Sequence, residues 1–430
     1  MDASLRGAGI ERRWAGRPGP STLVGGVIAT MLISTLFLTR FALTIGHSEL
    51  SLALVVVLVG MALLVVTGGV RVSPTRAMLF AVTVAFLMLA LMCGGGVQPS
   101  YLSFANLILL YAAWMFVVPD DRQFLHTLKL ARAMLLVIAL CGIAQFFAQV
   151  AIKAPVLFSW ETVVPPKLIS HGFNYTIPVP GLGGMNKSNG FFLLEPSSLS
   201  QMMAIAIIIE LEFFRPSWRI VVLATALALA FSGTGLVLFV TIVPLMLMTR
   251  GRGGLLLVAV PAAIAAGAVL AGPKIALMLD RLQEFGSDQS SGFARFLSPF
   301  YLFSDYLYPT TATTLFGMGP GTIETYTLKT AYVFHDPTWG KLIFEYGFLG
   351  ALPFACYVGY CFFAGARSTW LAAALFIDYL LLGGNLVDAR LQVLILALVV
   401  MQNRPRDMLA APFRTAARGS RNWVRTVPTA

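Results

Sequence analysis

The chain has 430 residues, of which 58% are hydrophobic and only 11% are charged, and its mean hydropathy is +0.81. Ordinary soluble proteins carry about 25% charged residues, so this composition excludes that class and predicts a polytopic membrane protein. The net charge of +11 is spread over short loops and the two tails, without a basic helix or an RNA-binding motif. We therefore expect no nucleic-acid partner.

Twelve apolar segments follow one another along the chain, and a membrane-spanning helix needs about 20 apolar residues. The expected fold is an all-α polytopic membrane protein with about 12 transmembrane helices and one large outer loop late in the chain. The seventh, eighth, eleventh and twelfth segments are short. The segments are 22–38, 52–70, 77–93, 101–118, 130–152, 190–214, 220–231, 235–248, 255–271, 340–363, 370–382 and 391–401.

The lysines and arginines predict the orientation of these segments, because cytoplasmic loops retain them. Most of the 30 basic residues fall on one set of alternate loops, which places both termini in the cytoplasm. The predicted organisation is a cytoplasmic tail (1–20), helices one to nine (21–271) with an outer loop (153–189), a large outer catalytic loop (272–339), helices ten to twelve (340–401) and a basic cytoplasmic tail (402–430).

The first outer loop is rich in proline and glycine, which predicts irregular backbone, and it leads to Glu195 followed by Pro196. A proline suits a helix start or a kink. An acid within a bilayer costs about 2.5–3.5 kcal/mol, so Glu195 is expected to have a partner or a water-filled cavity. The alternative is an interfacial glutamate that caps the helix N-terminus.

The second outer loop contains a strongly aromatic stretch that begins near Arg295. Such a segment is expected to lie on the membrane surface with its aromatic rings at headgroup depth. The planar guanidinium of Arg295 is suited to bind phosphate oxygens of a pyrophosphate in a bidentate manner. The alternative is an arginine that reaches ordinary phospholipid headgroups.

A glycine-rich turn at 317–321 and then His335-Asp336 end this loop. The turn lacks a preceding strand and a GK[ST] ending, so it is not a nucleotide loop; it either brings backbone, at Gly319, close to a substrate or serves as a structural turn. His335 is suited to act as a general base near neutral pH, with an acid nearby to orient it; the alternative is an ordinary surface histidine.

Metal and cofactor signatures are absent from the sequence. The four cysteines lie inside apolar runs without metal-ligand spacing, and no HExxH or paired-histidine pattern occurs. GxSxG is also absent, which argues against a familiar serine hydrolase. We therefore expect neither a metal nor a cofactor.

Together these residues resemble the bacterial O-antigen polymerase and O-antigen ligase superfamily, which includes exopolysaccharide polymerases. The shared features are the twelve-span plan and the large late loop. The motifs, in chain order, are Lys187-x-x-Gly190-x-x-x-x-Glu195-Pro-Ser, Ser232-Gly-Thr-Gly235, Arg295, the turn at 317–321, and His335 ahead of Glu345-Tyr-Gly347. Such families usually carry an arginine where this chain has Lys187, which keeps the charge but loses the bidentate fork. The Glu-Pro-Ser sequence is closer to the polymerases than to the ligases, and the short N-terminal tail, with the carbohydrate theme, suggests an exopolysaccharide polymerase of the xanthan type.

The resemblance implies a periplasmic reaction at the bacterial inner membrane that joins polyprenyl-pyrophosphate-linked oligosaccharide repeats. His335 is the expected base, with Glu195 as the alternative. Arg295, assisted by Lys187, is expected to stabilise the departing pyrophosphate, and Tyr301 and Tyr306 to lie against sugar or lipid.

Membrane lipid, a chain-length regulator and export machinery are the implied partners of such a polymerase. Two other functions remain open. One is an O-antigen ligase, which would transfer glycan to a lipid A core. The other is a transporter, which would need charged or broken helices near the middle of the membrane, where Asp378 is the acid that stands out.

Overall fold

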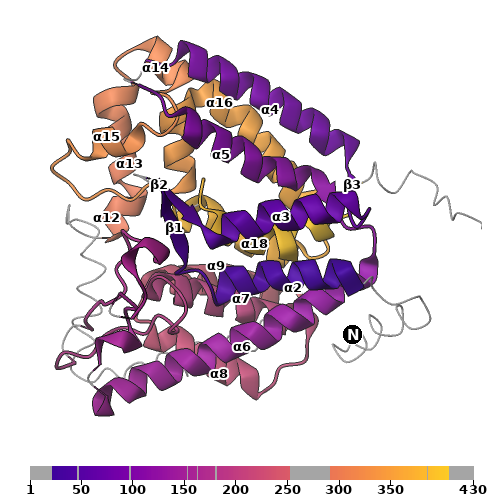
Figure 1. Ribbon diagram of the computed structural model, residues 1–430, viewed down its shortest axis with the longest axis vertical. Helices are drawn as coiled ribbons and strands as arrows, with labels where there is room; N and C mark the ends of the chain where they lie inside the picture. Colours follow the sequence, from indigo (N-terminus) through magenta and orange to yellow (C-terminus); the bar gives the residue numbers. More distant parts are fainter. Residues whose placement is uncertain are drawn as a thin grey trace, which may run out of the picture.

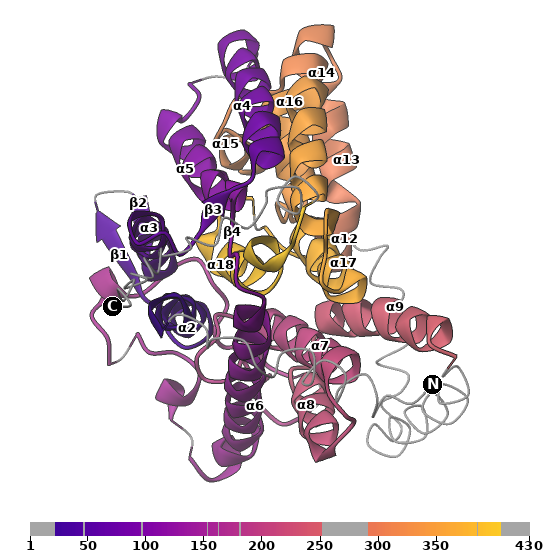
Figure 2. The same cartoon turned by 90° about the vertical axis from the view of Figure 1, so that its right-hand side faces the viewer.

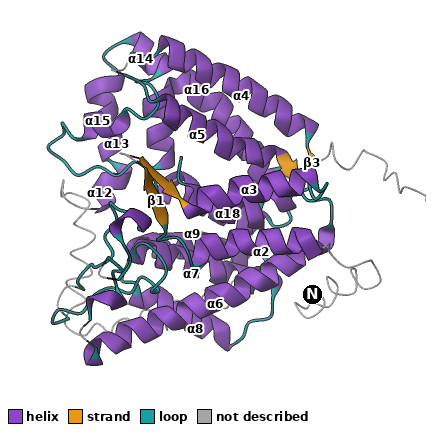
Figure 3. Cartoon of the chain, in the orientation of Figure 1, coloured by secondary structure: helices purple, strands orange, loops and turns teal. Residues whose placement is uncertain are grey.

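The computed structural model is a helical bundle with two short antiparallel strand pairs in the part it describes (Figures 1 and 3). The described residues are 22–45, 48–95, 98–152, 154–161, 163–179, 182–251, 291–384 and 386–405. The helical fold class predicted from the sequence is therefore confirmed.

Eleven of the twelve predicted apolar segments contain a helix, and the ninth, 255–271, lies outside the described residues. By length and composition, three of the described helices can cross a membrane, namely α4, α6 and α16; the others are shorter. The helices are α2 (Thr22–Leu36), α3 (Leu52–Val66), α4 (Pro74–Cys93), α5 (Tyr101–Ala112), α6 (Asp121–Ala151), α7 (Pro196–Phe213), α8 (Trp218–Leu229), α9 (Gly233–Thr249), α16 (Thr338–Phe363), α17 (Thr369–Ile377) and α18 (Ala389–Leu398).

The outer surfaces of these helices keep many apolar side chains exposed. Val59 of α3 is 63% exposed, Met92 of α4 is 82% exposed and Val221 of α8 is 68% exposed. Soluble proteins rarely expose wide apolar surfaces, whereas lipid accommodates them without cost. The surface therefore fits a bundle surrounded by lipid.

The helix α7 is enclosed by other helices and packs against α6, α8, α9 and α17; Figure 2 shows it between α6, α8 and α9. Most of its residues are buried, because it is apolar on nearly every face. It begins at Pro196, later than the predicted segment, since Gly190 and Phe191 both have positive φ and break the helical path. This start fixes the place of Glu195.

At one end of the bundle, arginines link neighbouring segments through ion pairs and hydrogen bonds. Arg367 and Arg404 both form ion pairs with Asp121 at the start of α6. The buried Arg76 donates to the carbonyl of Val400 at 2.9 Å. At the same end, β3 (Arg71–Val72) pairs with β4 (Phe116–Val117). The basic residues that predicted the cytoplasmic side thus include a group gathered at one end.

The opposite end carries the loops and short helices, on the left of Figure 1. The described part of the loop 153–189 is irregular as predicted, apart from two 3₁₀ turns. The described part of 272–339 is instead built from short helices. The elements here are β1 (Ala42–Ile45), β2 (Ser48–Ser51), η2 (Pro155–Leu157), η3 (Pro166–Leu168), α12 (Ser291–Phe296), α13 (Ser298–Leu302), η6 (Phe303–Leu307), α14 (Thr311–Phe316) and α15 (Ile323–Thr327).

A kink in α16 receives the glycine-rich turn. Gly347 has φ 61°, and a Cβ there would lie 2.3 Å from the carbonyl oxygen of Leu315. The N–H of Met318 donates to Phe344 O at 2.8 Å, and the N–H of Gly319 donates to Glu345 O at 2.9 Å. The turn therefore occupies the backbone groups that the kink leaves free.

Candidate functional site

Glu195 stands directly before α7, at the loop-bearing end of the bundle. Its Oε1 accepts a hydrogen bond from the backbone N–H of Asn174 at 3.2 Å, and its Oε2 accepts one from the Ser197 hydroxyl at 2.9 Å. The carboxylate makes no capping hydrogen bond to a backbone N–H of its own helix. Glu195 therefore faces the loop segments that cover the end of α7.

Arg295 lies on α12, which packs against the π-helical segment η7 (Asp378–Leu382) that continues α17. Within the described residues its guanidinium makes neither a hydrogen bond nor an ion pair. Burial lowers the pKa of Arg295, and the negative charges of Glu195 and Asp378 act in the opposite direction. A guanidinium in this setting is charged and has donors free for an anionic ligand.

Asp378 begins η7 and is fully buried. Neither of its carboxylate oxygens has a hydrogen-bond partner among the described residues. The charge that acts on it is that of Arg295. The sequence marked Asp378 only as an acid within an apolar segment, and its position beside Arg295 comes from the structure.

His335 is held next to α12 by its backbone, whose N–H donates to the carbonyl of Ala294 at 2.9 Å. Partial removal of water lowers the pKa of His335 from 6.5, and the positive charge of Arg295 lowers it further, against Glu195 and Asp336. An exposed imidazole with a lowered pKa is neutral at pH 7 and able to accept a proton.

The acid that follows His335 in the sequence does not orient its ring in this structure. Asp336 instead pairs with Lys341 across 3.1 Å between Oδ2 and Nζ, and the same Nζ lies 3.9 Å from the buried Glu345. This ionic chain joins the loop to the first turns of α16.

Four polar side chains thus gather from four separate segments: Glu195 before α7, Arg295 on α12, His335 before α16 and Asp378 on η7. The packing of α12 against η7 and the hydrogen bond from His335 N–H to Ala294 O bring three of them together, and the charge of Glu195 acts on both Arg295 and His335. Together they present a cation, two acids and a neutral imidazole. Among the described residues, no group of three or more histidines, cysteines or acids is arranged to hold a metal ion.

The remaining predicted site residues lie around this group or apart from it. Tyr301 is 54% exposed and packs on Phe293 of α12, with the two rings tilted by 35° and their centroids 5.6 Å apart. Tyr306 is half-buried against Tyr326, with ring centroids 4.9 Å apart. Tyr301 therefore flanks the helix that carries Arg295, and Tyr306 belongs to the packing of the loop.

Lys187 and Gly319 are held by their backbones. The N–H of Lys187 donates to Ile177 O at 2.8 Å within the first outer loop, and its side chain is half-buried. Gly319 is buried, and its N–H is committed to Glu345 O. This placement of Gly319 fits the alternative of a structural turn.

A search of protein-family models finds none that matches this chain, and a search of curated proteins finds no match.

Proposed function

We propose that the protein is a membrane glycosyltransferase that joins polyprenyl-pyrophosphate-linked oligosaccharide repeats into a polysaccharide. The observation that carries this proposal is the position of Arg295: a partly buried guanidinium with free donors, beside a neutral histidine, at the loop-bearing end of an apolar bundle. A lipid-linked pyrophosphate would have its polyprenyl chain in the bilayer and its charge at this level.

The proposed reaction is a displacement at the anomeric carbon of the growing chain. A sugar hydroxyl of the next lipid-linked repeat forms the new C–O bond, and the C–O bond to pyrophosphate breaks. The electron pair leaves with the phosphate oxygen, where Arg295 stabilises the developing negative charge. The hydroxyl proton passes to His335, which is neutral because its pKa is lowered. Glu195 is the alternative acceptor for that proton.

The acidic side chains act on the cation electrostatically, without direct contact. Glu195 is engaged with Asn174 and Ser197, and Asp378 is fully buried on a different element, η7. Neither carboxylate forms an ion pair with the guanidinium. The donors of Arg295 are therefore free for the leaving group, which needs no separate metal ion in this scheme.

The test is complementation of a cell that lacks the protein, with the wild type, Arg295→Ala or His335→Ala at matched membrane abundance. Both variants are expected to lose high-molecular-weight polymer and to accumulate single lipid-linked repeats. Arg71→Ala and His171→Ala are matched controls, because Arg71 is an exposed residue of β3 and His171 is paired with Glu49.

Three outcomes of this experiment would contradict the proposal, each in a different part. Normal polymer with both site variants overturns the assignment of the site. Normal polymer in the strain without the protein overturns the polymerase function. Transfer of one finished glycan to a lipid A core, without lengthening, replaces the polymerase with the ligase.

A further inference from the structure

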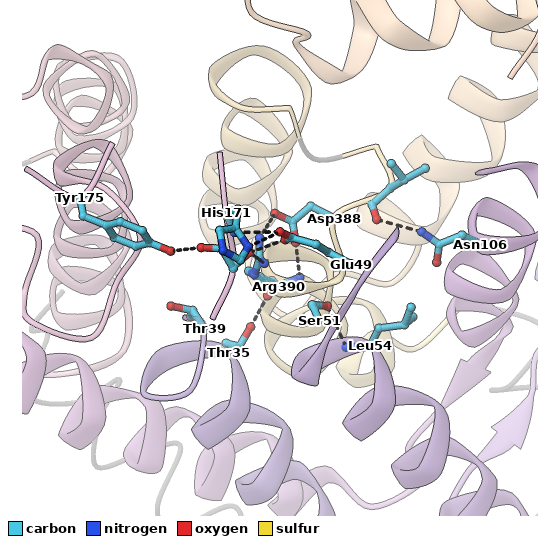
Figure 4. Close-up of polar contacts among 12 residues, drawn as sticks. Thr35, Thr39, Glu49, Ser51, Leu54, Asn106, His171, Tyr175, Asp388 and Arg390 are labelled. Carbon is cyan, nitrogen blue, oxygen red and sulfur yellow. Dashed lines mark hydrogen bonds and ion pairs between the residues drawn. The ribbon is translucent and has the colours of Figure 1, made fainter. Parts of the chain in front are cut away.

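A cavity of about 70 Å³ lies between α2, α7 and α18, at the loop-bearing end of the bundle. Its apolar lining comes partly from Leu193 and Leu194. Thr35, Thr39, Asp388 and Arg390 converge on this region in Figure 4. The polar side chains that line the cavity are Thr35, Thr39, Ser198, Gln201, Asp388 and Arg390.

This cavity, which we call the α2–α18 pocket, shares the start of α7 with Glu195. Leu194 lines it just before Glu195, and Ser198 lines it three residues after Glu195, in the first turn of α7. Gln201 also reaches Leu382 at the end of η7, where its Nε2 donates to the carbonyl oxygen at 3.4 Å. The pocket is therefore joined to the two elements that carry Glu195 and Asp378, the acids whose charges act on Arg295.

The polar groups of the pocket suit hydroxyl groups better than an anion. Arg390 is paired with Asp388 at 3.2 Å, which balances its charge, and its Nη2 donates to the Ser170 hydroxyl at 2.6 Å. The Ser198 hydroxyl makes no hydrogen bond within the described residues. A hydroxyl both donates and accepts, and it finds donors and acceptors side by side here.

The walls of the pocket are fixed before any ligand binds. The fully buried Arg40 donates from Nε and Nη2 to Leu193 O at 3.0 and 2.9 Å, and Thr39 donates to Phe192 O at 2.9 Å. Thr35 donates to the backbone carbonyl of Arg390. Fixed walls reduce the entropy lost on binding, which favours recognition of a small polar group.

We infer that the α2–α18 pocket binds hydroxyl groups at one edge of a sugar ring of the lipid-linked substrate. Its volume corresponds to about two water molecules, which is enough for the hydroxyls of a ring edge and not for a whole ring. This inference rests on the proposed function, because Arg295 would bind the pyrophosphate while the pocket binds the attached glycan. The pocket would then determine which sugar the enzyme accepts.

The test compares two probes on the purified full-length protein in lipid nanodiscs. One is bare polyprenyl pyrophosphate, and the other is the lipid-linked repeat extracted from cells that lack this protein. The wild type is expected to bind the glycan-bearing lipid about tenfold more tightly than the bare one, since the sugar hydroxyls gain hydrogen bonds in the pocket that the bare lipid lacks. Ser198→Leu fills the pocket and should abolish this preference while leaving the affinity for bare lipid unchanged.

Two further variants make the result specific. Ser217→Leu is the matched control, because Ser217 is exposed before α8, at the opposite end of the bundle, and it should keep the tenfold preference. Gln201→Leu preserves most of the side-chain volume and removes the lining amide, so it should reduce the preference. If Ser198→Leu misfolds and binds neither lipid, the preference of Gln201→Leu for the glycan-bearing lipid tests the pocket instead.

The outcomes separate this inference from the function on which it rests. A preference for the glycan-bearing lipid that survives both pocket substitutions overturns the pocket assignment and leaves the polymerase standing. Equal binding of the two lipids by the wild type has the same meaning. Failure of the wild type to bind either lipid overturns both proposals.

Discussion

At the scale of single residues, desolvation and then the charge of Arg295 lower the pKa of His335. His335 accepts a proton only when neutral, and its pKa lies below 6.5 because of partial desolvation and the nearby guanidinium. Polymer formation is therefore expected to be constant near neutral pH and to fall as the pH drops through that pKa. Arg295→Gln removes the positive charge and raises the pKa of His335, so the acidic limb of its low residual activity moves to higher pH.

Initial rates in membrane vesicles from about pH 5 to pH 8 measure this limb. Arg295→Lys is the control, because it keeps the charge and should leave the limb in place even where the rate is lower. An acidic limb that does not move in Arg295→Gln would show that the titrating group is not the histidine beside it.

Asp378 gives a second prediction at this scale, in which stability and activity change in opposite directions. Its buried carboxylate has no hydrogen-bond partner among the described residues, and a charge in that position destabilises a fold. Asp378→Asn should therefore raise the Tm in detergent, by about 2–4 °C for each kcal/mol recovered, and lower polymer formation. A lower Tm instead would show that the carboxylate stabilises the fold.

At the scale of elements, the glycine-rich turn packs against the kink of α16 and bonds to its free carbonyl groups. Gly347→Ala would place a Cβ 2.3 Å from Leu315 O at a residue with φ 61°. Strain and displacement of the turn should together cost more than about 2 kcal/mol, with a lower Tm. Gly359→Ala is the control on the same helix, since a Cβ there meets nothing within 4 Å, and it should leave the Tm unchanged or raise it.

The helices could be predicted from the sequence because long apolar runs leave few alternatives in a chain of this composition. Their bounds could not, since polar residues also join helices. The predicted segment 130–152 proves to be part of α6, which begins at Asp121 after the Asp120 side chain caps the N–H of Arg122 at 3.0 Å. A capped polar turn has no hydropathy signal.

The sequence predicted individual residues of the candidate site but not how they are arranged. Arg295, Glu195 and His335 were each recognised as polar residues beside or between long apolar segments. The addition of Asp378 depends on how η7 packs against α12, more than 80 residues apart in the chain. Similarly, the role of Gly319 depends on the distant carbonyl of Glu345. Contacts of this kind leave no local pattern in a single sequence.

At the scale of the whole molecule, the two ends of the bundle differ in chemistry. Asp121 anchors arginines at one end, and Arg295 and His335 lie at the other. The charge distribution predicts that the first end faces the cytoplasm.

In a background without the four native cysteines, Thr310→Cys should react with a membrane-impermeant thiol reagent in intact cells, and Ser217→Cys only after permeabilisation. The reverse pattern would overturn the orientation.

The hydrogen bonds between the glycine-rich turn and α16 should keep the two fragments together after the chain is cleaved by a protease. Leu328 is 87% exposed and Lys329 is exposed beside it, so trypsin can reach this peptide bond. The fragment before the cut stays attached through the hydrogen bonds of Met318 and Gly319 to α16, and His335 stays attached through Ala294 O. A protein nicked once after Lys329 should therefore migrate as two fragments on a denaturing gel, yet elute as one particle and retain its polymerising activity.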